Sequence, residues 1–221
     1  MKILVDPGHG FDVKGKESPD ASNGLVNSPL YFREYAWARK CAHGVVDVLQ
    51  AEGYDAELLV PEEWDVSLDT RVARVNAWCR KLGAANVILV SIHVNAAGSE
   101  RKWLDARGWC IYTSRGQTKA DDLATCIYNN AVTELAKVGY TKSFKNGSKQ
   151  KPIRTNWTDG DADQEAGYAM IKKTMCPAVL SENLFQDNKE DVAFLKTDKG
   201  LGAIIQLHVQ GIEDYLKNEK R

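Results

Sequence analysis

Short apolar runs alternate with stretches of helical periodicity along most of the chain. The apolar runs predict buried strands at 2–6, 56–60, 87–92, 108–113 and 177–182. Apolar positions three and four residues apart predict helices at 30–52, 68–82, 117–135 and 197–217. Strands that alternate with helices favour right-handed crossovers between parallel neighbours. We therefore expect an α/β fold with a mostly parallel, twisted sheet and helices on both faces.

Cap and loop residues mark the ends of several predicted elements. Ser67 has the character of a helix N-cap, and Gly83 follows the last apolar position of the same helix. Residues 11–29 and 140–163 are polar and rich in residues that favour loops, and the second segment is long enough to be a loop insertion. The sequence contains neither an internal repeat nor a break in composition, so we expect a single domain over residues 1–221.

Composition narrows the class of protein. Of the 221 residues, 43% are hydrophobic and 27% are charged, which is enough apolar material for a sizeable core. The 29 basic and 30 acidic residues give a net charge of −1 without a basic stripe, so we expect no nucleic-acid partner. The longest apolar run, at 87–92, is far too short to cross a bilayer, so we expect no integral membrane segment.

The cysteines and the first residues of the chain give expectations about the redox state of the protein and its export. The 5 cysteines lack a C-x-x-C spacing and lie in or beside apolar segments, so we expect reduced core thiols. The first residues run directly into the predicted strand at 2–6, without the pattern of a secretory signal. We therefore expect either a protein made without export or one whose leader has been removed.

Polar residues with catalytic potential follow three of the predicted strands. His9 comes after the first strand, His93 after the third, and Glu182 ends the last. Glu34 lies near the start of the first long helix, which a crossover places at the same edge of the sheet. Ligands of open α/β sheets collect outside the carboxyl ends of the strands. We therefore expect these side chains to lie near one another.

Histidine and glutamate side chains are suited to catalytic zinc, which takes three protein ligands and leaves one position open. A further carboxylate nearby would be free to act as a general base. Structural alternatives exist for each residue: His9 as a turn residue that bonds the glycine-rich backbone, His93 as a strand end satisfied by a carbonyl group, and Glu182 as a solvated strand end. Their coincidence at three strand ends favours the metal site.

An ordered set of motifs along nearly the whole chain resembles a known family. The motifs are Asp6-Pro7-Gly8-His9-Gly10, Asn23-Gly24-Leu25, Glu34 at a helix start, Ser67-Leu68 with Arg71 and Asn76, Ser91-Ile92-His93-Val94-Asn95-Ala96, Gly108 with Tyr112, and Pro177-Ala178-Val179-Leu180-Ser181-Glu182-Asn183-Leu184-Phe185 with Asn188. In combination they resemble the zinc-dependent N-acetylmuramoyl-L-alanine amidases of the amidase 3 type. The resemblance implies a single catalytic domain that hydrolyses the amide between N-acetylmuramic acid and L-alanine in peptidoglycan, its expected partner.

The resemblance also implies a role for each matched residue. His9, Glu34 and His93 would hold the zinc ion, and Glu182 would be the catalytic carboxylate. The interval from His9 to Glu34 is longer than the family pattern, which makes Glu17 a rival ligand. We prefer Glu34, because it follows the Asn-Gly-Leu element and directly precedes a helical pattern.

Two other functions compete with this one. The first is another zinc peptidase or carboxypeptidase that acts on the peptidoglycan stem. The second is an inactive wall-binding module, against which the presence of Glu182 after a buried strand argues. A phage endolysin and a bacterial wall-remodelling enzyme both fit the chain.

The roles of four further polar residues are less specific. Asn95 shares a side of its strand with His93. A functional role, in which it orients a ligand or bonds the stem peptide, and a structural role, in which it only closes the strand, are equally good interpretations. Arg71 lies within the helix predicted at 68–82 and is expected to pair locally rather than to contact the substrate. Arg154 in the long loop has the planar fork that binds carboxylates, but a solvated loop is the better interpretation. His208 is in register with apolar helix positions and is expected to be packed.

Overall fold

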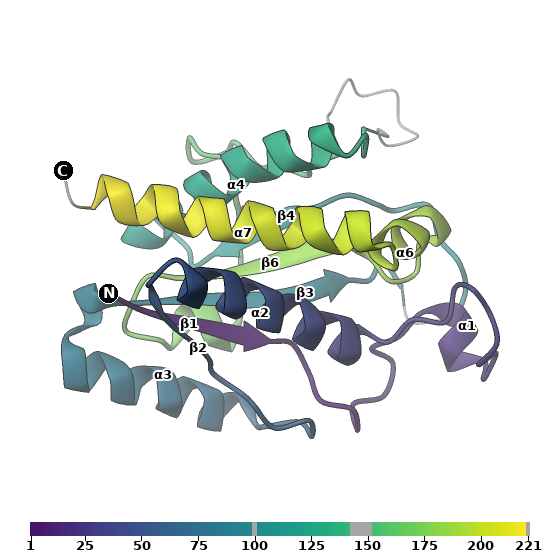
Figure 1. The fold of residues 1–221 in the computed structure, drawn as a ribbon, viewed down its shortest axis with the longest axis horizontal. Coiled ribbons are helices and arrows are strands. Elements are labelled where there is room, and N and C mark those ends of the chain that lie inside the picture. Colours follow the sequence, from purple (N-terminus) through teal and green to yellow (C-terminus); the bar gives the residue numbers. More distant parts are fainter. Residues whose placement is uncertain (99–100, 142–151, 220–221) are drawn as a thin grey trace.

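The computed structural model describes residues 1–98, 101–141 and 152–219, and six strands in it form one sheet (Figure 1). The sheet order is β2-β1-β3-β6-β4-β5. The strands are β1 (Lys2–Pro7), β2 (Asp55–Leu58), β3 (Val87–Asn95), β4 (Cys110–Thr113), β5 (Gln164–Glu165) and β6 (Ala178–Phe185). β1 pairs in parallel with β2 and β3, and β3 pairs in parallel with β6. Among these six described strands only β4 and β6 pair antiparallel, so the predicted mostly parallel sheet is confirmed.

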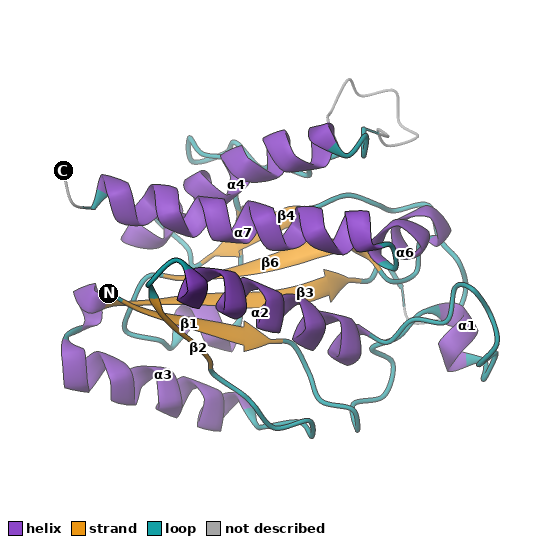
Figure 2. Cartoon of the chain, viewed as in Figure 1, coloured by secondary structure: helices purple, strands orange, loops and turns teal. Residues whose placement is uncertain are grey.

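Helices cover the two faces of this sheet (Figure 2). They are α1 (Pro19–Ser22), α2 (Glu34–Ala51), α3 (Leu68–Leu82), the 3₁₀ turn η1 (Ala84–Asn86), α4 (Lys119–Lys137), α5 (Ala169–Lys172), α6 (Lys189–Leu195) and α7 (Asp198–Asn218). Apolar residues of α2, α4 and α7 form one core cluster with alternate residues of the strands, such as Val5 and Val90. α3 and α5 pack on the other face, where Leu4 and Leu89 point.

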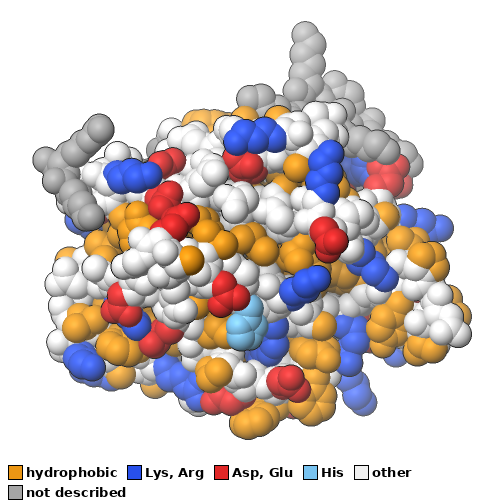
Figure 3. All heavy atoms as spheres, viewed as in Figure 1, with side chains coloured by type: hydrophobic (Ala, Val, Ile, Leu, Met, Phe, Trp, Pro, Cys, Tyr) orange, Lys and Arg blue, Asp and Glu red, His pale blue; other side chains and the backbone are white. Residues whose placement is uncertain are grey.

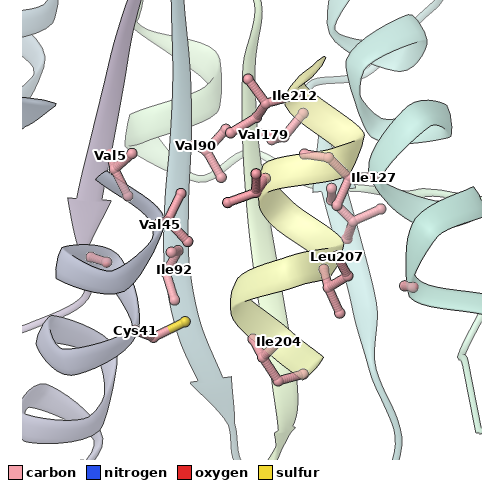
Figure 4. Close-up of a cluster of buried hydrophobic side chains, with 14 of the residues drawn as sticks. Val5, Cys41, Val45, Val90, Ile92, Ile127, Val179, Ile204, Leu207 and Ile212 are labelled. Carbon is pink, nitrogen blue, oxygen red and sulfur yellow. The ribbon is translucent and has the colours of Figure 1, made fainter. Parts of the chain in front are cut away.

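The larger core lies between the sheet and α2, α4 and α7. Figure 4 shows Cys41 and Val45 of α2 beside Val90 and Ile92 of β3, with Leu207 of α7 farther along the same layer. The strands in the middle of the sheet are buried on both faces, which explains their nearly continuous apolar sequence. This rigid centre fixes the positions of the strand ends.

Several predicted bounds differ from the observed ones. The helix predicted at 30–52 begins only at Glu34, because the preceding residue Arg33 is extended and forms a β-bridge with Glu17. The segment 11–29, expected to be a loop, contains the short helix α1. The third and last strands extend beyond their apolar runs, to Asn95 and Phe185. In contrast, α3 spans the predicted residues, with the Ser67 side chain as its N-cap.

The segment predicted as a loop insertion, 140–163, lies only partly within the described residues. Residues 142–151 lie outside them. Residues 152–163 contain no helix, and a β-bridge between Ile153 and Trp109 holds them to the end of the sheet.

The cysteines are buried or partly buried, as the sequence predicted. All five cysteines are unpaired, and Cys126 alone is only partly buried. Among the described helices, none is both long enough and apolar enough to cross a bilayer. On the face shown in Figure 3, which is viewed as in Figure 1, basic and acidic side chains are interspersed rather than separated into one-signed fields.

The parallel strands share one carboxyl edge. In Figure 1 the arrowheads of β1 and β3 point toward the side of the molecule where α1 lies, and the two termini lie at the opposite side. The register places Pro7 of β1 beside Ile92 of β3, and His93 beside Glu182 of β6. Residues that follow these positions therefore meet at one edge.

Candidate metal centre and active site

Three of the predicted site residues bring their donor atoms together at this carboxyl edge. His9 follows β1, His93 lies in β3, and Glu34 is the first residue of α2. One donor atom of each lies within 4.8 Å of the other two. Residues 25 and 59 positions apart along the chain thus form a compact group of two imidazoles and one carboxylate.

Glu34 is the buried centre of this group. Its side chain is only 1% exposed, and its Oε1 accepts a hydrogen bond from the Val94 backbone N–H at 3.0 Å. The same oxygen lies 3.1 Å from His93 Nδ1 and 3.5 Å from His9 Nε2. Burial acts to raise the pKa of Glu34, but the hydrogen bond and charge of His93, with His9 and Val94, bring the pKa below its usual value. Glu34 is therefore a carboxylate at neutral pH.

The two histidines differ in their protonation. Burial lowers the pKa of His9 to about 4, despite the attraction of Glu34. Burial is the largest single effect and acts to lower the pKa of His93, but the hydrogen bond and charge of Glu34, with the charges of Glu182 and Asp6, together raise the pKa above its usual value. The two rings meet edge to face, with centroids 5.0 Å apart. His9 is thus neutral and free to donate a lone pair, while His93 shares a proton with the carboxylate unless a cation replaces that proton.

The turn after β1 is shaped to hold His9 against His93. His9 has φ 59°, in the left-handed region that costs a residue with a side chain about 1–2 kcal/mol. A Cβ atom on Gly8 would lie 2.5 Å from His93 Nδ1, so this position needs glycine for the close approach. The Gly8 N–H donates to Ile92 O at 2.9 Å, which ties the turn to β3.

A buried ion pair supports the same turn. Asp6 and Arg71 are 1% and 2% exposed, and Arg71 Nη1 lies 2.7 Å from Asp6 Oδ1. The same guanidinium nitrogen donates to Pro7 O at 2.8 Å, and the Ser91 hydroxyl donates to Asp6 Oδ2 at 2.6 Å. Arg71 also makes the expected local contact with Asp65, at 3.2 Å. The predicted local pairing is thus present, and the side chain also reaches β1, the strand that precedes His9.

Glu182 lies beside the group rather than within it. It pairs with His93 across β3 and β6, and its Oε2 is buried without a hydrogen-bond partner among the described residues. Burial raises the pKa of Glu182 to about 7, with a further increase from Glu34 and opposing effects from His93 and Lys16. Because its pKa lies near neutrality, this carboxyl group can both accept and release a proton at physiological pH.

These side chains line a cavity of about 360 Å³. Besides His9, Glu34, His93 and Glu182, its walls include Lys16 and Tyr168, neither of which the sequence singled out. The side chains of His9 and His93 are 20% and 17% exposed, so both can be reached from the cavity. The cavity therefore opens onto the donor atoms.

The rival ligand Glu17 does not join the donor group. Its carboxylate lies 3.6 Å from Arg33 Nε and accepts a hydrogen bond from the Ser22 hydroxyl. It lines a neighbouring cavity of about 680 Å³, together with Lys14 and Arg101. Geometry therefore favours Glu34 over Glu17 as the third donor.

The remaining predicted residues take structural positions. His208 is fully buried, with Nδ1 2.7 Å from Ile204 O and Nε2 2.8 Å from the Ser181 hydroxyl, so its packed position is confirmed. Asn95 lines the cavity, but its Oδ1 accepts the Ala96 N–H at 2.8 Å. Arg154 lies over the Phe185 ring, outside the residues that line the cavity.

The donor set fits a catalytic zinc ion. Zinc in enzymes takes imidazole nitrogens and carboxylate oxygens, and keeps one position open. Glu34 Oε2 is buried and has no hydrogen-bond partner among the described residues, so one oxygen of the central carboxylate is unsatisfied by the protein. A divalent cation would offset this buried charge.

Comparisons with known proteins show which family the chain is similar to. The family model described as N-acetylmuramoyl-L-alanine amidase matches residues 3–214. The endolysin of Bacillus phage SPP1 is 25% identical over 221 residues, which are 99% of this chain and 67% of the endolysin. The N-acetylmuramoyl-L-alanine amidase CwlM of Bacillus licheniformis is 26% identical over 215 residues, 96% of this chain and 67% of that protein.

Solved structures share the architecture. The crystal structure of N-acetylmuramoyl-L-alanine amidase from Clostridium difficile 630 superimposes with a TM-score of 0.70 at 20% identity. The match covers 99% of this chain and 97% of that one, so the likeness extends over the whole fold.

Proposed function

Because the chain belongs to the amidase 3 family of N-acetylmuramoyl-L-alanine amidases, we propose a zinc-dependent mechanism in which His9, Glu34 and His93 hold the cation. The activity of the chain is hydrolysis of the amide between N-acetylmuramic acid and L-alanine in peptidoglycan. The observation that carries the zinc proposal is the convergence of three donor atoms within 4.8 Å around a buried carboxylate.

The charges of the donors support a divalent cation. Glu34 is ionised and His9 is neutral near pH 7, as metal ligands must be. A cation that displaces the proton of His93 would be bound by two neutral rings and one negative charge, and so would keep a net positive charge. When bound, zinc supplies a Lewis acid that polarises a carbonyl group and makes water more acidic.

Glu182 is the residue that we propose moves the proton. It lines the same cavity as the donors, and its pKa of about 7 suits a group that gains and loses a proton in turn. Glu182 would accept the proton of the attacking water and deliver a proton to the departing alanine amine. The two transfers follow one another, so a single carboxyl group can perform both.

The ion pair of Asp6 and Arg71 would position the first histidine. Arg71 holds the carbonyl group of Pro7, two residues before His9, and thereby fixes the turn on which the imidazole sits. Since it is buried away from solvent, we assign Arg71 to positioning and not to contact with the substrate.

Metal analysis combined with a peptidoglycan assay tests this function. We expect the purified chain to contain close to one zinc ion, to lose activity when a chelator removes it, and to regain activity on addition of zinc. The products should be stem peptides with a free alanine amino terminus. Release of terminal amino acids would indicate a carboxypeptidase instead, and full activity of metal-free protein would refute the zinc proposal.

A further inference from the structure

Three aspartate side chains meet on the far side of β4 from Glu182. Asp121 lies in the first turn of α4, and Asp161 and Asp163 directly precede β5. One carboxylate oxygen of each lies within 4.8 Å of the others, and we call these three residues the aspartate cluster. Cys110 at the start of β4 pairs with Glu182, whereas Thr113, which contacts the cluster, lies about 10 Å farther along the strand. The cluster is therefore separate from the catalytic cavity.

Asp163 is the most buried member of the aspartate cluster, with only 3% of its surface exposed. The Thr113 hydroxyl donates to its Oδ1 at 2.9 Å. Its Oδ2 is buried and has no hydrogen-bond partner among the described residues. A buried carboxylate oxygen without a donor is costly unless a proton or a cation satisfies it. This oxygen is the observation that points to a ligand.

Hydrogen bonds to nearby residues satisfy the carboxylates of Asp121 and Asp161 only in part. Asp121 accepts the Thr118 backbone N–H in the capping box of α4, and Asp161 accepts the Gln117 side-chain amide at 3.0 Å. Both donors are neutral. Within residues 1–98, 101–141 and 152–219, none of these three aspartates forms an ion pair with a basic side chain. Helix capping accounts for the place of Asp121, but it leaves three like charges close together.

We propose that the aspartate cluster binds a divalent cation of the calcium class. The candidate donors are all carboxylate oxygens, which calcium accepts in irregular geometry, whereas zinc favours imidazole and thiolate donors. Asp159 adds a further carboxylate two positions before Asp161, so the loop carries acidic residues at every second position, as at the start of an EF-hand loop. The loop is not an EF-hand, since Gln164 stands where that motif requires glycine. Asp161 is partly exposed, which lets water complete the coordination.

The cation would join two segments that are far apart in sequence. Residues 152–163 reach the sheet through the bridge of Ile153, and Asp121 belongs to the helix that packs against α7. A cation at the aspartate cluster would fasten this loop to the start of α4. We therefore assign the site to stability of the fold, and its occupancy does not depend on the zinc proposal.

Calcium titration of the full chain, followed by isothermal calorimetry, tests this site. We expect one calcium ion to bind to the wild type and equally to His93→Ala, which lacks a donor of the catalytic group. Asp163→Asn should weaken calcium binding at least tenfold, because it removes one charge while an amide oxygen can still accept from Thr113. The matched control Asp122→Asn removes an exposed carboxylate from the same helical turn and should bind calcium as the wild type does.

Thermal unfolding separates a lost ligand from a damaged fold. At the same calcium concentration, calcium should raise the Tm of the wild type by several degrees and that of Asp163→Asn by less. In chelator, Asp163→Asn should be at least as stable as the wild type, because it relieves repulsion. If Asp163→Asn does not fold, Asp161→Asn provides the same comparison at a partly exposed position. Failure of the wild type to bind calcium at about 10 mM, or equal binding by the wild type and both cluster variants, would overturn the proposal.

Discussion

Among the described residues, two clusters contain a buried carboxylate, and their neighbours shift its pKa in opposite directions. At the carboxyl edge of β1 and β3, Glu34 lies between two imidazoles, and its pKa is lowered despite its burial. In the aspartate cluster, burial and the nearby carboxylates raise the pKa of Asp163 to about 7, even though Thr113 donates to it. Burial alone would raise both values. The side chains within reach therefore decide whether a buried carboxylate is ionised.

Histidines show the same contrast. Burial acts to lower the pKa of both His93 and His208. Glu34 raises the pKa of His93 above the usual value, whereas His208, whose ring nitrogens contact the Ser181 hydroxyl and the Ile204 carbonyl group, has a pKa of about 4. The carboxylate beside His93 thus accounts for the opposite pKa shifts of the two buried histidines.

Removing the central carboxylate should give the largest effect. We expect Glu34→Gln to lose zinc. Peptidoglycan hydrolysis should then fall further than on loss of a general base, which lowers a rate by about 10²–10⁴-fold. Asp163→Asn is the control from the other acidic group and should hydrolyse peptidoglycan at nearly the wild-type rate. Zinc content by mass spectrometry and release of amino groups from isolated walls measure both. Normal zinc content in Glu34→Gln would remove Glu34 from the ligand set.

Glu182→Gln should separate proton transfer from metal binding. We expect zinc content to match the wild type, because Glu182 lies outside the donor group, and turnover to fall by about 10²–10⁴-fold. In the wild type, activity should decline as the pH falls below about 7, since protonated Glu182 cannot accept a proton from water. The hydrolysis rate measured as a function of pH, at a buffered zinc concentration, tests this decline. Normal turnover of Glu182→Gln would contradict the assignment.

Breaking the buried ion pair should destabilise the fold. Arg71→Met leaves Asp6 buried without its partner, and we expect the free energy of unfolding to decrease by about 3–5 kcal/mol. Arg74→Met is the matched control, because its pair with Glu62 is partly exposed, and we expect a loss below about 1 kcal/mol. Urea unfolding measures both variants. Equal losses of unfolding free energy in the two variants would show that burial of the Arg71 pair does not increase its contribution to stability.

The smallest expected effect is a pH dependence from His208. Its folded pKa of about 4 lies below the unfolded value of 6.5, so the unfolded chain takes up a proton first as the pH falls. Stability should therefore be lost between about pH 6.5 and 4, by at most about 3 kcal/mol from this group. His208→Gln should lack this part of the loss. If the difference in unfolding free energy between the wild type and His208→Gln stays constant from pH 7.5 to 4, the explanation is contradicted.

The sequence predicted that the residues at the strand ends lie close together, because parallel strands share one carboxyl edge. This principle alone placed His9, His93 and Glu182 near one another, and the structure does bring them to one cavity. Glu34 was placed at the same edge because a crossover helix starts there, whereas its role as a metal ligand came from the family resemblance. The short helices α1, α5 and α6 were missed, because four to seven residues are too few to show a helical period.

Contacts between distant polar residues were beyond the sequence patterns. Arg71 was expected to pair locally, yet its 2.7 Å partner, Asp6, lies in a different element. Asp121 likewise meets Asp163 only because α4 and the loop before β5 are adjacent in the fold. Periodicity predicts which face of an element is buried, but it does not identify the charged partner across from it.

The central claim is that His9, Glu34 and His93 hold one zinc ion. An anomalous difference map at the zinc edge, from crystals of the purified full chain, tests it most directly. We predict one peak at about 2.0–2.2 Å from a donor atom of each residue, with Glu182 nearby but unbound. An active, zinc-containing protein whose anomalous peak lies elsewhere would contradict the account.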